Sequence, residues 1–271
     1  MRHDYYSYTK EQLLKQPKIH LLCYETDQDV FRHMAQEMVE AICKNEAQGK
    51  NTVFICPVGP VGQYPYFTEE VNRRRLDLKN VWFLNMDEYL TDAKEWIDPS
   101  HPLSFRGFME REVYNKIDKD LVMPKEQRIF PDPHDTEHMM QVIEELGGVD
   151  ICFGGIGLNG HIAFNEADTS KSPEEFRALR TRVLPVSRET QAANAIGDFN
   201  GALEDMPNYC VSIGMAEILK AKKIRLGCFR SWHRAVVRRA AYGEPSGDFP
   251  VTLLQEHSDI TISFTEFVAQ L

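Results

Sequence analysis

The sequence predicts an α/β fold with a largely parallel central sheet. Two observations support this prediction: short β-branched or aromatic runs recur along the 271 residues, and longer segments of helical period separate them. Strands that alternate with helices pair in parallel, because each helix returns the chain to the same end of the sheet. The predicted strands are residues 19–24, 52–56, 81–85, 150–154, 224–229 and 260–264.

Apolar residues at helical spacing predict the connecting helices. Between the first two strands the pattern follows Asp27 and Asp29, which are candidate caps. The apolar positions of that helix are Phe31, Met34, Ala35, Met38, Val39 and Ile42. Residues 136–146 and 231–242 predict two further helices, and we expect Arg234, Arg238 and Arg239 on or near the outer face of the second.

The charge balance excludes several classes of partner. The chain has 31 Lys and Arg against 41 Asp and Glu, which gives a net charge of −10 and a pI near 5.4. An acidic protein without a long basic run repels nucleic-acid phosphates and anionic lipid. We therefore expect a small-molecule partner, and any bound anion requires a local site.

We expect one domain over residues 18–271, preceded by an extension over residues 1–17 in which Tyr5, Tyr6 and Tyr8 are candidate anchors. No repeat, low-complexity tract or Gly/Ser linker divides the chain. No apolar stretch reaches the roughly 18 residues of a membrane helix. The six cysteines have neither zinc-site nor disulfide-framework spacing, so we expect reduced core thiols and a cytoplasmic protein.

Ligands of parallel sheets bind beyond the carboxyl ends of the strands, so the segments that follow strands are the candidate site. Residues 57–63, 85–89 and 154–166 each follow a predicted strand. The last segment places four glycines before His161, and Glu166 follows five residues later. Glycines allow close backbone approach, and a histidine held by a carboxylate is a suitable general acid or base. A simple tight turn with a surface histidine is the alternative interpretation.

Asp87 and Glu88 follow another strand and are a second pair of acid/base candidates, or else a helix cap and a solvated charge. Their expected location at the same sheet edge as His161 favours proton transfer at carbon. No His-Glu-x-x-His spacing or Walker Lys-Ser/Thr ending is present, and Gly59 and Gly62 alone are a weak phosphate-loop signal. We predict neither a metal ion nor a cofactor.

Two longer motifs resemble those of the glucosamine-6-phosphate deaminase (isomerase) family. They are Asn-Met-Asp-Glu-Tyr at residues 85–89 and the glycine-rich Asn-Gly-His-Ile-Ala-Phe-Asn-Glu at residues 159–166. The similarity extends over roughly residues 19 to 265. It implies a Rossmann-like sandwich with helices on both sheet faces, and conversion of an amino-sugar 6-phosphate into fructose 6-phosphate and ammonia.

The resemblance also implies roles for individual residues. Asp87 corresponds to the base that moves a proton between C2 and C1, and His161 to the residue that assists ring opening, with Glu166 and Asn159 orienting it. Amides of the glycine-rich loop are suited to stabilise the developing oxyanion. The substrate-binding positions implied are Gly59, Val61, Gly62, Glu88, Gly155, Gly157, Gly160, Gln191, His233 and Arg234.

The implied phosphate site departs from the family pattern. Val58 and Val61 replace hydroxyl-bearing residues, and Pro60 removes an amide donor. Gln191 stands where the family has arginine and His233 where it has lysine, although Arg230 and Arg234 are adjacent to His233 in sequence. We therefore expect altered recognition of the 6-position.

Asn159 also stands where some members of the family carry an acid. A neutral amide can orient His161 but cannot stabilise its positive charge as a carboxylate would, so the pH profile is expected to differ.

Two functions other than that of an amino-sugar isomerase/deaminase are the alternatives. A 6-phosphogluconolactonase-like hydrolase shares the implied fold and a Gly-His loop, but residues 162–166 and 85–89 are deaminase-like. A non-catalytic sugar-binding member would explain the altered phosphate loop, but it has no need of Asp87, His161 and Glu166. The sequence leaves homo-oligomer formation and allosteric activation open.

Overall fold

The computed structural model describes residues 3–271. Its central sheet has seven strands in the order β1-β10-β9-β6-β2-β3-β5, and every neighbouring pair is parallel. The strands are β1 (His20–Tyr24), β2 (Thr52–Cys56), β3 (Val81–Asn85), β5 (Arg128–Ile129), β6 (Val149–Gly155), β9 (Ala221–Cys228) and β10 (Ile260–Thr265). All six predicted strands are present, and the predicted α/β class is confirmed.

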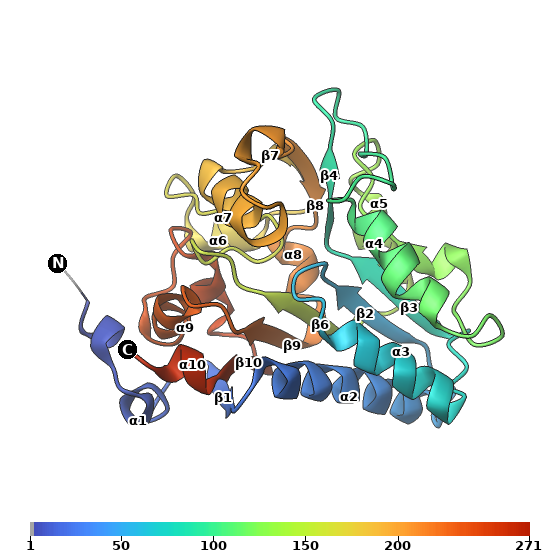
Figure 1. Ribbon diagram of the computed structural model, residues 1–271, viewed down its shortest axis with the longest axis horizontal. Helices are drawn as coiled ribbons and strands as arrows, with labels where there is room; N and C mark the ends of the chain where they lie inside the picture. The colour runs from blue at the N-terminus through green and yellow to red at the C-terminus, as the bar shows by residue number, and fades with distance from the viewer. Residues whose placement is uncertain (1–2) are drawn as a thin grey trace.

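Helices cover both faces of this sheet, which separates two hydrophobic cores (Figure 1). Side chains alternate across a strand, so Val53 and Ile55 of β2 face one core while Phe54 and Cys56 face the other. The Phe54 side is covered by α2 (Asp27–Glu46), α3 (Gln63–Arg74) and α4 (Phe105–Glu112). The Val53 side is covered by α5 (His138–Glu145), α8 (Met215–Ile218), α9 (His233–Tyr242) and α10 (Glu266–Ala269).

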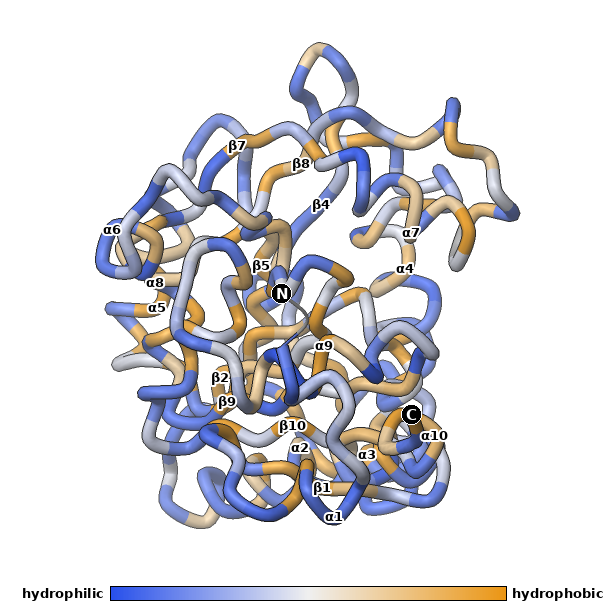
Figure 2. Tube along the Cα trace, turned by 90° about the vertical axis from the view of Figure 1, so that its left-hand side faces the viewer, coloured by the Kyte–Doolittle hydropathy of each residue, from blue (hydrophilic) through white to orange (hydrophobic). Residues whose placement is uncertain are grey.

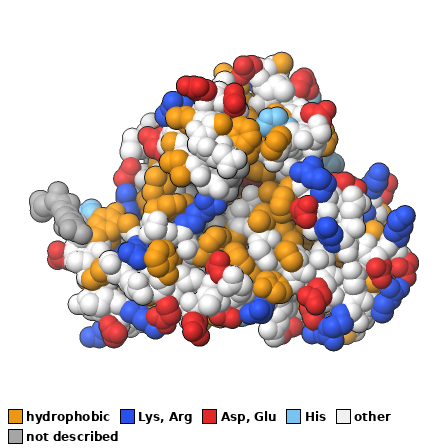
Figure 3. All heavy atoms as spheres, viewed as in Figure 1, with side chains coloured by type: hydrophobic (Ala, Val, Ile, Leu, Met, Phe, Trp, Pro, Cys, Tyr) orange, Lys and Arg blue, Asp and Glu red, His pale blue; other side chains and the backbone are white. Residues whose placement is uncertain are grey.

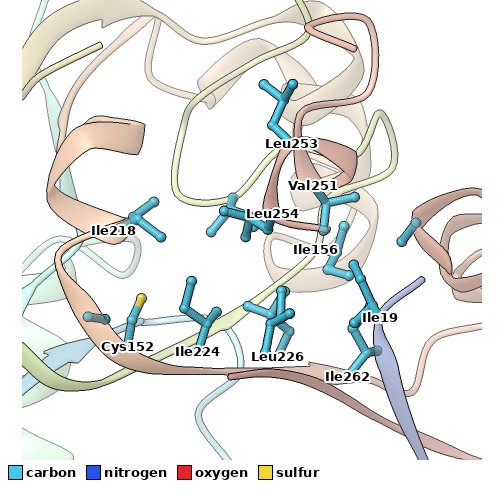
Figure 4. Close-up of a cluster of buried hydrophobic side chains, with 14 of the residues drawn as sticks. Ile19, Cys152, Ile156, Ile218, Ile224, Leu226, Val251, Leu253, Leu254 and Ile262 are labelled. Carbon is cyan, nitrogen blue, oxygen red and sulfur yellow. The ribbon is translucent and has the colours of Figure 1, made fainter. Parts of the chain in front are cut away.

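Figure 4 shows part of the core on the Val53 side. Ile224 and Leu226 of β9 pack beneath Leu254, which belongs to the 3-10 helix η5 (Pro250–Leu254), and Ile262 of β10 lies next to Ile19. Burial of each such side chain stabilises the fold by about 1.5–3 kcal/mol. Hydrophobic segments likewise occupy the sheet and its covering helices, whereas many outer turns are hydrophilic (Figure 2).

A second, antiparallel sheet lies beyond the carboxyl end of the first and was not predicted. It contains β4 (Asp87–Leu90), β8 (Tyr209–Ser212) and β7 (Arg182–Pro185), in that order. Met86 joins the two sheets: its amide donates to Cys56 and its carbonyl accepts from Ile213. The chain therefore passes directly from β3 into β4, and α6 (Pro173–Arg177) and α7 (Arg188–Asp198) lie beside the small sheet (Figure 1).

Two sequence predictions about local structure need correction. The N-cap of α2 is Thr26, whose hydroxyl accepts from the amide of Asp29, while the Asp29 carboxylate accepts from the amide of Thr26. Asp29 thus completes a capping box instead of acting as the cap itself. Among the cysteines, Cys23 and Cys43 are half-buried, and only the other four are fully buried core thiols.

Arg238 lies inside the protein, contrary to the prediction, with 1% of its surface exposed. Its guanidinium donates to the carbonyl of Tyr8 and to the carbonyls of Val268 and Ala269 in α10. It therefore ties the predicted N-terminal extension, which contains η1 (Asp4–Ser7) and α1 (Lys10–Leu13), to the C-terminal helix. Tyr8 also packs edge-on against Tyr242, whereas Tyr5 and Tyr6 pack against each other.

No helix among residues 3–271 is long and apolar enough to cross a membrane. Two short 3-10 helices, η2 (Tyr114–Lys116) and η3 (Lys125–Gln127), connect α4 to β5, and η4 (Leu203–Asp205) precedes β8.

Candidate active site

A cavity of about 460 Å³ lies where the strand order reverses. From β2 the chain continues to β3 on one side, whereas β6 lies on the other side and leads to β9. The loops at the carboxyl ends of β2 and β6 therefore diverge and leave a space between them. Loops after β2, β3, β6 and β9 line this space, which agrees with the predicted location. The space-filling view shows this face hollowed near its centre, with hydrophobic side chains around the hollow (Figure 3).

Asp87 is the first residue of β4 and lines the cavity with only 7% of its surface exposed. Burial, together with the negative charge of Glu88, raises its pKa to about 8. A carboxylate whose pKa lies near neutral pH binds a proton strongly enough to act as an efficient general base. The predicted acid/base candidate is thus located in the cavity.

Glu88 points away from the cavity, because neighbouring residues of a strand face opposite sides. Its carboxylate accepts hydrogen bonds from the Ser104 hydroxyl (2.9 Å) and from the amides of Phe105 (3.0 Å) and Arg106 (2.9 Å). Burial raises its pKa, and these hydrogen bonds oppose that rise. Glu88 therefore holds the first turn of α4, and the structure does not place it among the predicted substrate contacts.

His161 lines the same cavity, with its ring against Gly157. A β-carbon built on Gly157 would lie 1.9 Å from the imidazole carbon Cε1, so this position admits only glycine. The Gly157 amide also donates to the carbonyl of His161 at 2.9 Å. The glycine-rich segment therefore forms a tight turn that closes on His161 and presents its ring to the cavity.

Asn159 and Glu166 set the orientation and tautomer of His161. The Asn159 amide nitrogen Nδ2 donates to Glu166 Oε2 at 2.7 Å, since an ionised carboxylate can only accept. Asn159 must then present Oδ1 to His161, whose Nδ1 lies 2.7 Å away and must carry the hydrogen. Nε2 is thereby left as the basic nitrogen, and it makes no hydrogen bond to any residue that the structure describes.

Glu166 is ionised at neutral pH. Burial alone would raise its pKa, but the hydrogen bond and charge of His161, with help from Asn159 and Thr190, lower it to about 2. Its Oε2 lies 3.3 Å from His161 Nδ1. Thr190 of α7 completes the group, with its hydroxyl 3.4 Å from the same nitrogen. Asn159 and Glu166 do not line the cavity and act through His161.

The other predicted glycines differ in their positions. Gly59, Gly62 and Gly155 line the cavity, and Gly59 has a φ of +146°, which favours glycine. Gly160 has a φ of +81° and packs on Phe249 outside the cavity. The Gly157 and Gly160 amides are used within the turn, the latter donating to the Gly157 carbonyl at 3.0 Å. These two amides are therefore not available for the expected oxyanion contact.

His233 lines the cavity but does not carry the charge expected at this position. Its Nδ1 accepts from the amides of Phe229 (2.9 Å) and Arg230 (2.8 Å), and Nε2 donates to the Ile156 carbonyl (3.0 Å). Burial lowers its pKa to about 4. His233 is thus a neutral residue that joins the loops after β9 and β6.

Two predicted substrate contacts lie outside the cavity. Gln191 donates to the Pro207 carbonyl at 3.1 Å and does not line the cavity. Arg234 packs over Phe267 and donates to its carbonyl, so its guanidinium is directed at the C-terminal helix. Of the two arginines considered at the phosphate site, it is Arg230 that lines the cavity.

Sequence reasoning missed several lining residues. Asn194 of α7 donates to the Tyr89 hydroxyl at 2.9 Å, and both side chains line the cavity. Phe31 was assigned to the inward stripe of α2 but instead lines the cavity and packs edge-on against Phe229 at 5.0 Å. The available signal for Phe31 was its place near the start of a helix that follows a strand, because such residues lie close to the carboxyl edge of the sheet.

Within residues 3–271, no group of three or more His, Cys, Asp or Glu side chains is close enough to share a metal ion.

Curated proteins with sequences similar to this chain are named glucosamine-6-phosphate deaminase, whereas no protein-family model matches it. The protein from Exiguobacterium sibiricum is 32% identical over 213 residues, which are 78% of this chain and 77% of that protein. The protein from Thermoanaerobacter sp. (strain X514) is 29% identical over 249 residues, which are 89% and 92% of the two chains.

Solved structures show the same architecture. A monomeric glucosamine-6-phosphate deaminase superposes with a TM-score of 0.80 at 25% identity, over 93% of this chain and 99% of that one. The 6-phosphogluconolactonase of Trypanosoma brucei superposes with a TM-score of 0.62 at 16% identity, over 94% and 98%. At this lower identity the likeness concerns the fold alone.

Proposed function

The chain belongs to the glucosamine-6-phosphate deaminase family, and from that premise we propose that it is an amino-sugar aldose–ketose isomerase and deaminase that releases ammonia. The observation that carries the proposal is the pair of proton-transfer groups in one cavity. Asp87 is a buried carboxylate with a raised pKa, and His161 is an imidazole whose tautomer Asn159 and Glu166 determine. We propose a reaction without a cofactor.

His161 acts first, by opening the sugar ring. Its Nε2 takes the proton of the C1 hydroxyl, and the imidazolium then returns a proton to the ring oxygen as the C1–O5 bond breaks. The ionised Glu166, 3.3 Å from Nδ1, stabilises the transient positive charge. The product is the open-chain aldehyde.

Asp87 then carries out the isomerisation. Its carboxylate takes the proton from C2 while O1 of the aldehyde takes a proton from the ammonium group, which forms an enolamine between C1 and C2. Asp87 then delivers its proton to C1. The nitrogen at C2 becomes an imine, water adds to that carbon, and ammonia leaves to give the ketose. Burial of Asp87 strengthens it as a base, because its ionised form is poorly solvated.

The two alternatives are less well supported. The likeness to 6-phosphogluconolactonases lies at 16% identity and concerns only the fold, whereas the similar curated sequences are deaminases. A non-catalytic sugar-binding protein has no requirement for a buried base such as Asp87 beside an oriented His161. Lactone hydrolysis assayed with 6-phosphogluconolactone tests the first alternative directly.

The deciding experiment is an ammonia-release assay with glucosamine, galactosamine and their 6-phosphates. We expect turnover of at least one sugar, with ketose formed in equal amount. Asp87→Asn and His161→Gln should each lower kcat by about 10²–10⁴-fold, as loss of a general base or acid does. Asp168→Asn is a matched control, because Asp168 forms a surface ion pair with Lys171 outside the cavity. Absence of ammonia and ketose from every sugar would contradict the proposal.

Localisation and assembly belong to the same proposal. All six cysteines are unpaired, which suits the reducing cytoplasm that we propose as the compartment. We propose neither nucleic acid nor membrane as a partner, because the net charge is −10. The related solved structure is of a monomeric enzyme, and a homo-oligomer of this chain stays a prediction that analytical ultracentrifugation can test.

A further inference from the structure

The part of the cavity that lies over β2 and β9 has apolar walls. Phe31, Val58, Pro60, Val61, Phe229 and Trp232 line it. These walls are continuous: the rings of Phe31 and Phe229 are in edge-on contact, and β-carbons built on Gly155 and Gly227 would touch Pro60 at 3.3 Å and 3.5 Å. A substrate whose reacting carbons lie at Asp87 and His161 has these walls on one side.

Arg230 is the only lysine or arginine among the described residues that line this cavity. His233 cannot add a second charge, because backbone amides and a carbonyl occupy both of its nitrogens. Arg234 is directed at the C-terminal helix, and Gln191 at the Pro207 carbonyl. The cavity therefore offers one permanent positive charge.

The guanidinium of Arg230 lies against α7. A β-carbon on Gly197 would lie 2.2 Å from its Nη1. Arg230 and Trp232 also line an adjoining groove of about 440 Å³, together with Glu189 and the exposed side chains of Leu158 and Ile196. Arg230 thus lies between the cavity and this groove.

A phosphate monoester carries a charge of about −1.5 to −2 at neutral pH and needs several charged or hydroxyl donors when it leaves water. Here Val58 and Val61 supply no hydroxyl, and Pro60 supplies no amide. Two missing hydrogen bonds to a charged group lower affinity by about a hundredfold or more. One guanidinium cannot neutralise a phosphate dianion, whereas a monoanion or neutral hydroxyls require less positive charge.

We infer that the substrate is an amino sugar whose group at the 6-position is neutral or carries a single negative charge, in place of a phosphate dianion. The inference rests on the proposed function, since Asp87 and His161 define which end of the sugar reacts. It identifies Arg230 as the residue that contacts the 6-substituent.

The test compares kcat/KM for glucosamine, glucosamine 6-sulfate and glucosamine 6-phosphate by ammonia release. The sulfate ester has a single charge and nearly the shape of the phosphate, so it separates charge from size. We expect the best of the first two sugars to exceed the 6-phosphate by at least about tenfold. A higher kcat/KM for the 6-phosphate than for both others would overturn the inference. If no sugar reacts, the proposed function fails. The Kd values of the three sugars, measured by calorimetry, then decide the inference, which expects the 6-phosphate to bind most weakly.

Two sets of variants test the residues themselves. The double variant Val58→Thr, Val61→Thr keeps side-chain shape and adds two hydroxyls, so the 6-phosphate to glucosamine ratio of kcat/KM should rise by about tenfold or more. Arg230→Gln should lower the 6-sulfate to glucosamine ratio by about tenfold, whereas the control Arg234→Gln should leave that ratio unchanged. Ratios that stay constant in the first two variants would exclude these contacts.

Discussion

Replacing Asp87 by asparagine is expected to stabilise the protein while it abolishes proton transfer. The pKa of Asp87 is raised from 3.8 to about 8, chiefly by burial. The folded state therefore binds this proton more tightly than the unfolded state, and ionisation of Asp87 destabilises the fold as the pH rises from about 4 to about 8. Each pKa unit corresponds to about 1.4 kcal/mol, so the upper limit of the cost is about 6 kcal/mol.

Asparagine has nearly the same shape and cannot ionise. The gain in unfolding free energy of Asp87→Asn over the wild type should be small at pH 4, grow through pH 7 and level off above pH 8. Because water in the cavity solvates part of the charge, we expect about 2–5 kcal/mol at the plateau. Urea unfolding of both proteins at pH 4.5, 6, 7 and 8.5 measures this difference.

A difference that does not grow with pH would refute the assignment of a strongly raised pKa to Asp87. Asp168→Asn is the control of opposite sign, because Lys171 and Ser170 lower the pKa of Asp168 to about 2. The ionised Asp168 stabilises the fold, and this stabilisation is lost only as the pH falls below about 4. The difference in unfolding free energy between Asp168→Asn and the wild type should therefore not change between pH 5 and pH 8.5.

Three further predictions follow from single contacts. Glu166→Gln removes the carboxylate that determines the tautomer of His161 and should lower kcat about 10–100-fold with little change in KM; an unchanged kcat would contradict the hydrogen-bond chain. Gly160→Ala forces a β-carbon to within 2.5 Å of Phe249 at a φ of +81°, so the urea midpoint should fall by an amount equivalent to about 1–3 kcal/mol. Arg238→Met leaves buried carbonyls without donors and should destabilise the protein by about 3 kcal/mol, with faster limited proteolysis before residue 17; proteolysis at the wild-type rate would argue against the anchoring role.

The six main strands could be predicted because their signal is local. Runs such as residues 52–56 are apolar on both faces, as the strands of a covered parallel sheet must be. The small sheet could not be predicted, because β4 begins with Asp87 and Glu88 and its partners β8 and β7 come more than ninety positions later. Pairing at such distance depends on tertiary packing and leaves little trace in a window of ten residues.

The sequence by itself determined where the cavity would be and which residues could transfer protons. Asp87 and His161 follow strands, and the carboxyl ends of parallel strands meet at one edge. Only the tertiary structure decided which neighbouring charges face the cavity. Arg230, His233 and Arg234 lie within five positions, yet one lines the cavity as a cation, one is neutral between two loops, and one faces the C-terminal helix. Side-chain direction and burial set the charge that a ligand meets, and both depend on contacts between segments far apart in the chain.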